Sequence, residues 1–245
     1  MKTSNKLLVG FLILILLTIL GFVGAASYYF NQNSIAGNGV WSSETRTTES
    51  FSEIKTKGKI KVFLTQGSGQ KLEIKADQNI IPEIVTEVKD GKLTISSKSP
   101  IKRPKIEVYI TIPEIKGLYF AAGSNLETTG EIRGEKLTFS GDAGATGKLN
   151  INYGEMECQT SSGASFEISG TAKKANVIIS SGAHLNGENL SINVCSFNGS
   201  SGASAKLAVT DELSAEANSG ASFSYSGNPQ IKNISNSSGG SISKK

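Results

Sequence analysis

Apolar and polar positions alternate around a small-residue corner that recurs about every 19 residues through the C-terminal half of the chain. The central glycines of these corners follow one another at steps of 21, 19, 19, 20, 18 and 19 residues. They are Gly123, Gly144, Gly163, Gly182, Gly202, Gly220 and Gly239. Self-similarity at such a fixed period is the signature of a stacked repeat architecture.

Aligning the repeats on their glycines produces apolar columns on both sides of the corner. The position five residues before the glycine holds Leu118, Phe139, Cys158, Val177, Phe197, Ala215 and Ile234. The position three residues after it holds Leu126, Gly147, Phe166, Leu185, Ala205, Phe223 and Ile242. The columns between are polar, and this period of two predicts two half-buried strands per repeat.

One repeat is then one coil of a parallel β-helix. Coils stacked in register at ~4.8 Å would fill the interior with the apolar columns and expose the polar ones. Glycine at each corner would permit a positive φ. A flexible Ser/Gly linker has a similar composition, but a linker does not keep buried columns in a fixed phase. The sequence therefore predicts an all-β solenoid with about 19 residues per coil.

Residues 51–120 lack the glycine period and contain short alternating strands separated by turn signals. Asp90-Gly91 fits a tight turn, and residues 101–104 read as a loop. The end of a solenoid exposes unpaired backbone and apolar core. We therefore expect residues 51–120 to form the first, wider coils and the N-terminal β cap, and residues 121–245 to form the repeat coils of the same domain.

The N-terminal segment indicates where the protein resides. Residues 7–30 carry no charge and follow Lys2 and Lys6, and ~20 apolar residues can cross a bilayer. We expect residues 1–30 to be an uncleaved transmembrane signal anchor with the body outside the cytoplasm. The small residues 24–27 leave a cleaved signal peptide open, which would make the body periplasmic or secreted. Residues 31–50 read as a polar tether.

Several motifs after the tether occur in a characteristic order. They are Phe51-x-x-Ile54, Gly58-x-Ile60-x-Val62-x-Leu64-x-Gln66-Gly67, Leu93-x-Ile95, Ile106-x-Val108-x-Ile110-x-x-Pro113, and then repeated Ser-Gly-Ala-Ser corners. In this order the chain, over about residues 48–243, resembles the head GIN domain family, which is labelled a putative auto-transporter adhesin domain. The resemblance implies a right-handed β-helix-like fold exposed at a bacterial envelope, and it supplies no catalytic motif.

Charge and cysteine content narrow the possible chemistry. The 25 basic and 21 acidic residues are mixed along the chain, which argues against a nucleic-acid partner, because such binding needs a clustered basic face. Cys158 and Cys195 fall in inward columns two coils apart, ~9.6 Å along the stack, whereas bridged Cα atoms are seldom beyond ~7 Å. Both are expected to be buried small hydrophobes rather than a disulfide or a metal site.

The candidate contact residues lie in the outward columns. Glu127, Lys148, Glu167 and Lys206 share one column, and we interpret them as cross-strand charge pairs in preference to a general acid and base. His184, the only histidine, is expected to be a solvated corner residue. The sequence predicts no catalytic residue, cofactor or metal. Tyr109, Tyr119 and Tyr153 could be outward residues that stack on sugars, or could pack within the sheet.

The sequence thus predicts a membrane-anchored extracytoplasmic β-solenoid with a binding, adhesion or structural role at the bacterial cell envelope. Its partner would be an envelope or extracellular glycan or protein, with the membrane contacted through residues 7–30. One alternative is a carbohydrate-active β-helix enzyme with an acidic cleft flanked by Arg133 or Lys148. Another is a scaffold or regulatory partner of a membrane complex, contacted through Gly10, Gly21 or Gly24. Fold analogy does not choose among these.

Overall fold

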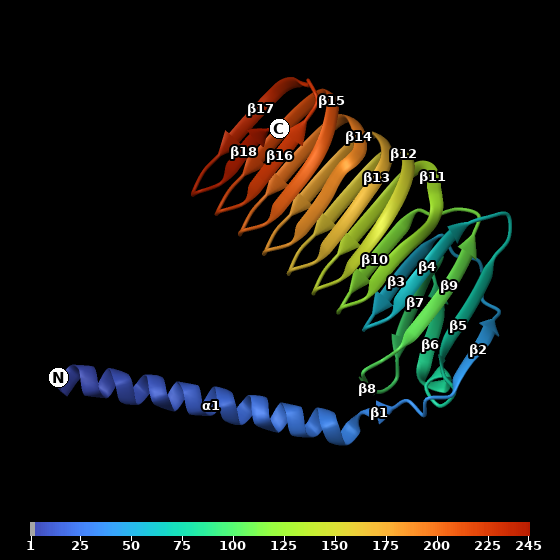
Figure 1. Cartoon of the computed structure of the whole chain (residues 1–245), viewed down its shortest axis with the longest axis vertical. Coiled ribbons are helices and arrows are strands. Elements are labelled where there is room, and N and C mark those ends of the chain that lie inside the picture. The colour runs from blue at the N-terminus through green and yellow to red at the C-terminus, as the bar shows by residue number, and fades with distance from the viewer. Residues whose placement is uncertain (1–2) are drawn as a thin grey trace.

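The computed structural model describes residues 3–245, with the side chains of residues 3–7, 26–27 and 29–32 left undescribed. It consists of an N-terminal helix, α1 (Thr3–Asn33), and a β-solenoid of about seven turns (Figure 1). Strands account for 62% of the chain. The predicted solenoid fold is therefore confirmed.

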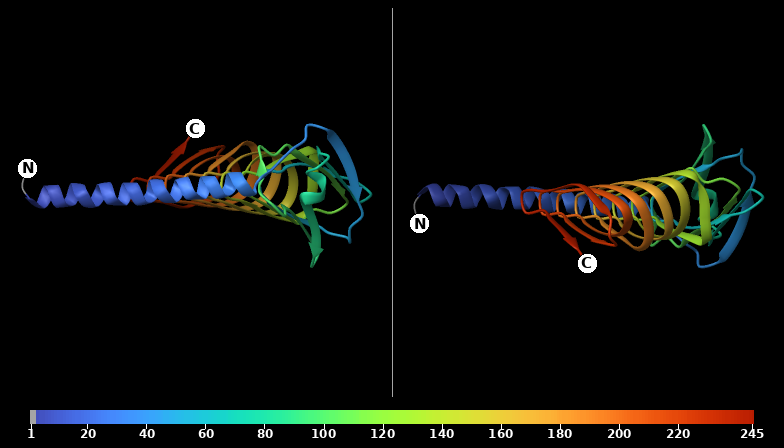
Figure 2. Two further views of the ribbon diagram at one scale, coloured as in Figure 1. Left: turned by 90° about the horizontal axis from the view of Figure 1, so that it is seen from below. Right: turned by 90° about the horizontal axis from the view of Figure 1, so that it is seen from above.

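Each repeat forms one coil, and Figure 2 shows the coils stacked along a common axis. The strands of this part are β11 (Asn125–Gly141), β12 (Thr146–Thr160), β13 (Ser165–Ile179), β14 (His184–Gly199), β15 (Ser204–Ala217), β16 (Ser222–Ser226), β17 (Gln230–Asn236) and β18 (Ser241–Lys244). Neighbouring coils pair in parallel in the register that the columns predict, for example Leu126 with Gly147 and Gly147 with Phe166. One sequence repeat therefore corresponds to one coil of the stack.

The corner at Ser181-Gly182 illustrates how the chain turns between the two strands of a coil. Both residues have positive φ, +52° and +68°, and the backbone N–H of Ala183 donates to the carbonyl of Ser180 at 3.1 Å. Two successive residues in this region define a type I′ turn. The N–H of Gly182 donates to the Ser201 carbonyl of the next coil at 3.0 Å, so the turns are themselves stacked.

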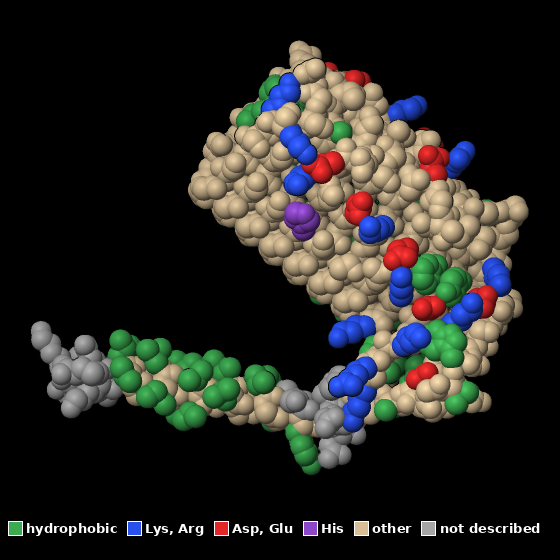
Figure 3. All heavy atoms as spheres, viewed as in Figure 1, with side chains coloured by type: hydrophobic (Ala, Val, Ile, Leu, Met, Phe, Trp, Pro, Cys, Tyr) green, Lys and Arg blue, Asp and Glu red, His purple; other side chains and the backbone are tan. Residues whose placement is uncertain are grey.

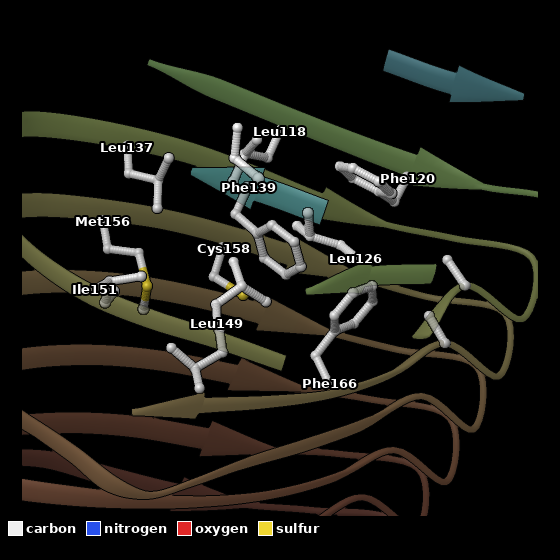
Figure 4. Packing of buried hydrophobic residues seen from close by; sticks show 14 of the residues in the cluster. Leu118, Phe120, Leu126, Leu137, Phe139, Leu149, Ile151, Met156, Cys158 and Phe166 are labelled. Carbon is white, nitrogen blue, oxygen red and sulfur yellow. The ribbon is translucent and has the colours of Figure 1, made fainter. Parts of the chain in front are cut away.

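The interior packs large side chains against small ones. Figure 4 shows Phe139 and Phe166 side by side in the interior. Their rings meet edge to face with centroids 4.7 Å apart, and Phe166 lies against Gly141 and Gly147. The two cysteines are buried in this core with free thiols, as expected. Burial raises the pKa of Cys158 to about 12, and that of Cys195 equally.

The first coils do not follow one another in chain order. The strands involved are β3 (Glu53–Lys57), β4 (Lys61–Gln66), β7 (Lys92–Ser97), β9 (Ile106–Ile112) and β10 (Gly117–Ala121). β3 lies between β7 and β10, and β4 lies between β9 and β11, all in parallel pairing. The coil made by β3 and β4 is therefore inserted between two coils that come later in the sequence.

Antiparallel strands complete the N-terminal end. β2 (Trp41–Arg46) pairs with β5 (Lys71–Asp77), β5 pairs with β9, and β6 (Ile84–Lys89) pairs with β7, with a 3-10 turn at Ile81–Glu83. This arrangement covers the parallel edge, which would otherwise be open to another chain. At the opposite end, β17 leaves Ile231 and Ile234 exposed.

The prediction of a polar tether over residues 31–50 is wrong for much of that range. α1 continues to Asn33, β1 (Ile35–Ala36) pairs with β8 (Ile101–Lys102), and β2 joins the sheet. β2 is polar, and its Arg46 guanidinium attaches it to the domain by donating to the carbonyl oxygens of Ile81 and Ile84 at 3.0 and 2.6 Å. β8 likewise occupies part of the segment expected to be a loop.

Candidate binding face

The strands that leave the corners present two outward columns, which together we call the charged face. In pairing order the first column holds Phe63, Glu127, Lys148, Glu167, Asn186 and Lys206, and the second holds Lys61, Asn125, Thr146, Ser165, His184 and Ser204. Figure 3 shows acidic and basic side chains alternating along this face, with the only histidine beside them. Outward alternation in each strand is what places these side chains together.

The structure brings four of the five predicted contact residues to one place. Glu127, Lys148, Glu167 and His184 line a shallow hollow of about 360 Å³, whose other polar walls include Asn125 and Asn186. Lys206 extends the same column, since it pairs in register with Asn186. The placement is as the sequence indicates, and a role in binding stays a prediction.

The charges of this face are paired along the stack. The Lys61 ammonium lies 2.9 Å from a Glu127 carboxylate oxygen, and that of Lys148 lies 2.9 Å from Glu167. The hydrogen bond to Glu167 raises the pKa of Lys148, with the charges of Glu167 and Glu127 acting in the same direction. Cross-strand pairing of this kind was the interpretation favoured by the sequence.

The arrangement does not resemble a glycosidase site. Glu127 and Glu167 belong to one column with Lys148 between them, whereas glycoside cleavage uses two carboxyl groups on either side of the scissile bond. Arg133, proposed as a flank of an acidic cleft, instead pairs with Glu131 at 3.0 Å and is not among the residues that line the hollow. What the face offers is a flat row of hydrogen-bonding groups.

An aromatic pair ends the charged face at its N-terminal side. The rings of Phe63 and Tyr109 are stacked with centroids 4.8 Å apart, and the Lys61 ammonium lies 4.6 Å from the Phe63 centroid. The Tyr109 hydroxyl donates to Glu107 at 2.8 Å, and this bond raises the pKa of Tyr109. Tyr109 was among the tyrosines expected to be candidates for sugar stacking, whereas Phe63 was not. The signal was present, because Phe63 is apolar at an outward position between Val62 and Leu64.

The other two tyrosines differ from each other. Tyr119 lies on β10, which enters a corner, beside a hollow of about 240 Å³, with the Lys92 ammonium 4.5 Å from its ring centroid. Tyr153 packs inside the solenoid, which is the second of the two possibilities indicated by the sequence. Its ring is buried where Gly134 makes room, its hydroxyl donates to the Ile115 carbonyl at 2.9 Å, and burial raises its pKa. Among the described residues, no three His, Cys, Asp or Glu side chains gather to hold a metal.

Comparison with known families decides the relationship of the chain. The model described as "Putative auto-transporter adhesin, head GIN domain" matches residues 50–229. The chain belongs to the head GIN domain family. The matched residues include the strands from β3 to β16, and exclude α1, β1 and β2 at one end and β17 and β18 at the other. The resemblance inferred from the motif order is confirmed. A search of curated proteins gives no match.

Solved structures share the fold of this head GIN domain. A putative adhesin from Bacteroides fragilis is 19% identical with a TM-score of 0.82, covering 86% of this chain and 100% of that chain. A putative adhesin from Parabacteroides distasonis is 21% identical with a TM-score of 0.69, covering 87% and 100%. A structure from the same organism described as a putative lipid binding protein is 19% identical with a TM-score of 0.69, covering 86% and 99%. At these identities the similarity establishes the fold.

Proposed function

We propose that this protein is a membrane-anchored binding module of the bacterial envelope, whose head GIN domain holds an extended glycan along the charged face. The observation that carries the proposal is the half-buried Phe63–Tyr109 pair continuous with a row of paired charges. Aromatic rings offer an apolar surface to a sugar ring, and the neighbouring polar groups provide hydrogen bonds that fix its orientation. The adhesin names of the family and of its solved structures agree with binding.

The N-terminal helix supports anchoring. Leu8–Ala25 is long and apolar enough to span a bilayer, and none of it is buried against the rest of the chain. Lys2 and Lys6 precede it, which favours a cytoplasmic N-terminus and an exported domain. A signal peptide passes the same test of length and composition, so retention of α1 is part of the proposal.

The function is tested with the full chain in nanodiscs on an array of envelope and extracellular glycans, scoring both retention and release of reducing ends. We expect retention without release. The variant Lys148→Gln/Glu167→Gln should weaken retention, since it removes one charge of each sign from the charged face. Lys136→Gln/Glu157→Gln is the matched control, because it removes a 2.6 Å pair between β11 and β12 that lies outside the charged face.

Three results would count against the proposal. Release of reducing ends would make the protein an enzyme. Equal retention by both double variants would move the binding surface away from the charged face. Neither retention nor release on any glycan would point to a protein partner, as in the scaffold alternative.

A further inference from the structure

A group of cations surrounds the point where α1 joins the domain. We call it the junction patch, formed by Lys57, Lys59, Lys102, Arg103 and Lys105. Four of these residues are exposed, and Lys102 is half-buried. Figure 3 shows basic side chains gathered beside the inner end of the helix.

The junction patch gathers five cations whose charges are not neutralised by ion pairs. Many other lysines meet carboxylates, as Lys92 does at Glu53 and Lys61 at Glu127, both at 2.9 Å. Throughout residues 3–245, no ion pair involves the five cations of the junction patch. Nearby, Glu107 accepts the Tyr109 hydroxyl, and Asp77 lies against the backbone of Gly37.

Backbone pairing fixes the patch close to the end of the helix. α1 ends at Asn33, and the N–H of Ile35 donates to the Pro100 carbonyl at 2.9 Å. Ile35 then pairs with Ile101, and Ala36 with Lys102. Two residues of extended chain span only about 7 Å, so Lys102 and Arg103 lie near the end of α1 whatever its direction.

The patch lies near the end of α1 whichever way the helix points, and this matters because the helix has to change direction to span a bilayer. In Figures 1 and 2 α1 and the coils extend from the junction toward the same side, so a bilayer around α1 would overlap the coils. Spanning therefore requires the chain to turn between Asn33 and Ile35. The β1–β8 pairing lies on the domain side of that turn and keeps the junction patch within a few residues of the end of α1.

A hollow beneath the cations adds an apolar component. It has a volume of about 340 Å³ and is lined by the apolar side chains of Ile60, Pro100, Ile101, Pro104 and Ile106. Lys57, Lys59 and Arg103 also line it. A basic rim over an apolar floor suits an amphipathic anion, with the charge at the rim and the hydrocarbon inside.

From this geometry we propose that the junction patch docks on anionic phospholipid headgroups of the leaflet from which α1 emerges. A lipid phosphate would lie among Lys57, Lys59 and Arg103, with the adjoining hydrocarbon against the apolar floor. The inference rests on the proposed membrane anchoring by α1. Each basic residue near an anionic surface favours the docked state by about fivefold. The patch would thus set the orientation of the domain above the membrane.

The sole tryptophan provides the readout. Trp41 is 40% exposed, and the Lys105 ammonium lies 4.5 Å from its ring centroid. We would reconstitute the full chain in vesicles of phosphatidylcholine, with or without phosphatidylglycerol, and measure energy transfer from Trp41 to a dansyl-labelled headgroup. Transfer should be higher with phosphatidylglycerol and should fall to the phosphatidylcholine value at high salt.

Matched variants locate the effect. Lys59→Gln/Arg103→Gln should reduce the docked-to-undocked ratio about 25-fold and leave Lys105 beside Trp41 in place. Lys173→Gln/Lys174→Gln removes the same charge from exposed positions on β13 and should leave transfer unchanged. The proposal is overturned if energy transfer does not change when phosphatidylglycerol is added, or if it falls equally in both variants. Loss of transfer with inorganic phosphate at matched ionic strength also overturns it, in favour of a soluble-anion site.

Anchoring is measured separately from docking. Flotation with pure phosphatidylcholine vesicles in high salt reports α1 alone, because the junction patch has no anionic lipid to bind there. If the chain does not float, the anchoring proposal fails and the docking inference fails with it. If it floats but Trp41 transfer is insensitive to phosphatidylglycerol, only the docking inference fails.

Discussion

Phe166 and Gly141 offer a direct test of how the solenoid interior is packed. A Cβ built on Gly141 would overlap the Phe166 ring, and every atom it would meet within 3.1 Å belongs to that ring. Gly141 is therefore a glycine because Phe166 needs the space. The two substitutions Phe166→Ala and Gly141→Ala should each destabilise the protein, yet each should reduce the cost of the other.

The magnitudes follow from the contacts. Phe166→Ala should cost about 4 kcal/mol, since the glycines at 141 and 147 cannot fill the space that the ring leaves. Gly141→Ala alone should cost about 2 kcal/mol by overpacking. With the ring absent, the same change buries a methyl group and removes a strand glycine, a gain of about 1.5 kcal/mol. The double variant should therefore lose about 2.5 kcal/mol, where additivity gives about 6 kcal/mol.

The assay is urea unfolding of the full chain in a non-ionic detergent, followed by far-ultraviolet circular dichroism, for all four members of the cycle. The slope of each transition must stay constant for the free energies of unfolding to be compared, because repeat proteins lose cooperativity readily. If Gly141→Ala lowers stability by the same amount with and without Phe166, the reasoning is refuted.

Further predictions concern the corners, the thiols, a buried hydroxyl and a carboxylate. Gly182→Ala should cost about 1–2 kcal/mol in urea unfolding although its Cβ would meet nothing within 4 Å, because φ is +68°; an unchanged midpoint would contradict this. Cys158 and Cys195 should resist maleimide at pH 8 until urea unfolds the chain, since their pKa values near 12 leave about one thiol in ten thousand ionised; rapid labelling of the native protein would argue against burial. Tyr153→Phe should cost about 1 kcal/mol by leaving the Ile115 carbonyl without its 2.9 Å donor, which thermal unfolding would detect. Hydrogen bonds from Ser161, Ser162 and the Ala143 N–H lower the pKa of Asp142, so its contribution is present above about pH 4 and is lost as pH falls through the lower folded-state value; an Asp142→Asn variant should show a shallower loss of stability in acid.

The repeat coils could be predicted from the sequence because the side-chain period of a strand is two. A slip of one residue would turn an apolar column outward, and a slip of two would break the stacking of the glycine corners, so the two patterns together favour the alignment that pairs Leu126 with Gly147 and Gly147 with Phe166. The same reasoning placed Glu127, Lys148 and Glu167 in one outward column. The sequence predicted that these charges pair across neighbouring strands, but it did not identify Lys61 as the partner of Glu127.

Other features could not be predicted because they depend on which strands meet. Alternation in β3 and β4 shows that these segments are strands, but it carries no information on whether their neighbours precede or follow them in the chain. Trp41–Arg46 is polar enough to resemble a tether and becomes a strand through Arg46, whose acceptors lie about 35 residues away or more. Tyr153 could have been placed, since it continues the inward phase of Leu149 and Ile151.

The inserted coil has a mechanical consequence. A pulling force applied through α1 reaches β1 and β2 first; β1 pairs only with β8 in a separate two-stranded sheet, and β2 pairs with β5 at the margin of the large sheet. The load then passes to β3, which is bonded along its length to β7 on one side and β10 on the other. Parallel neighbours on both flanks must shear together before β3 can leave, whereas a strand at the end of a stack unzips one bond at a time. The order of the first coils thus makes β3 a clamp against tension from the N-terminal end.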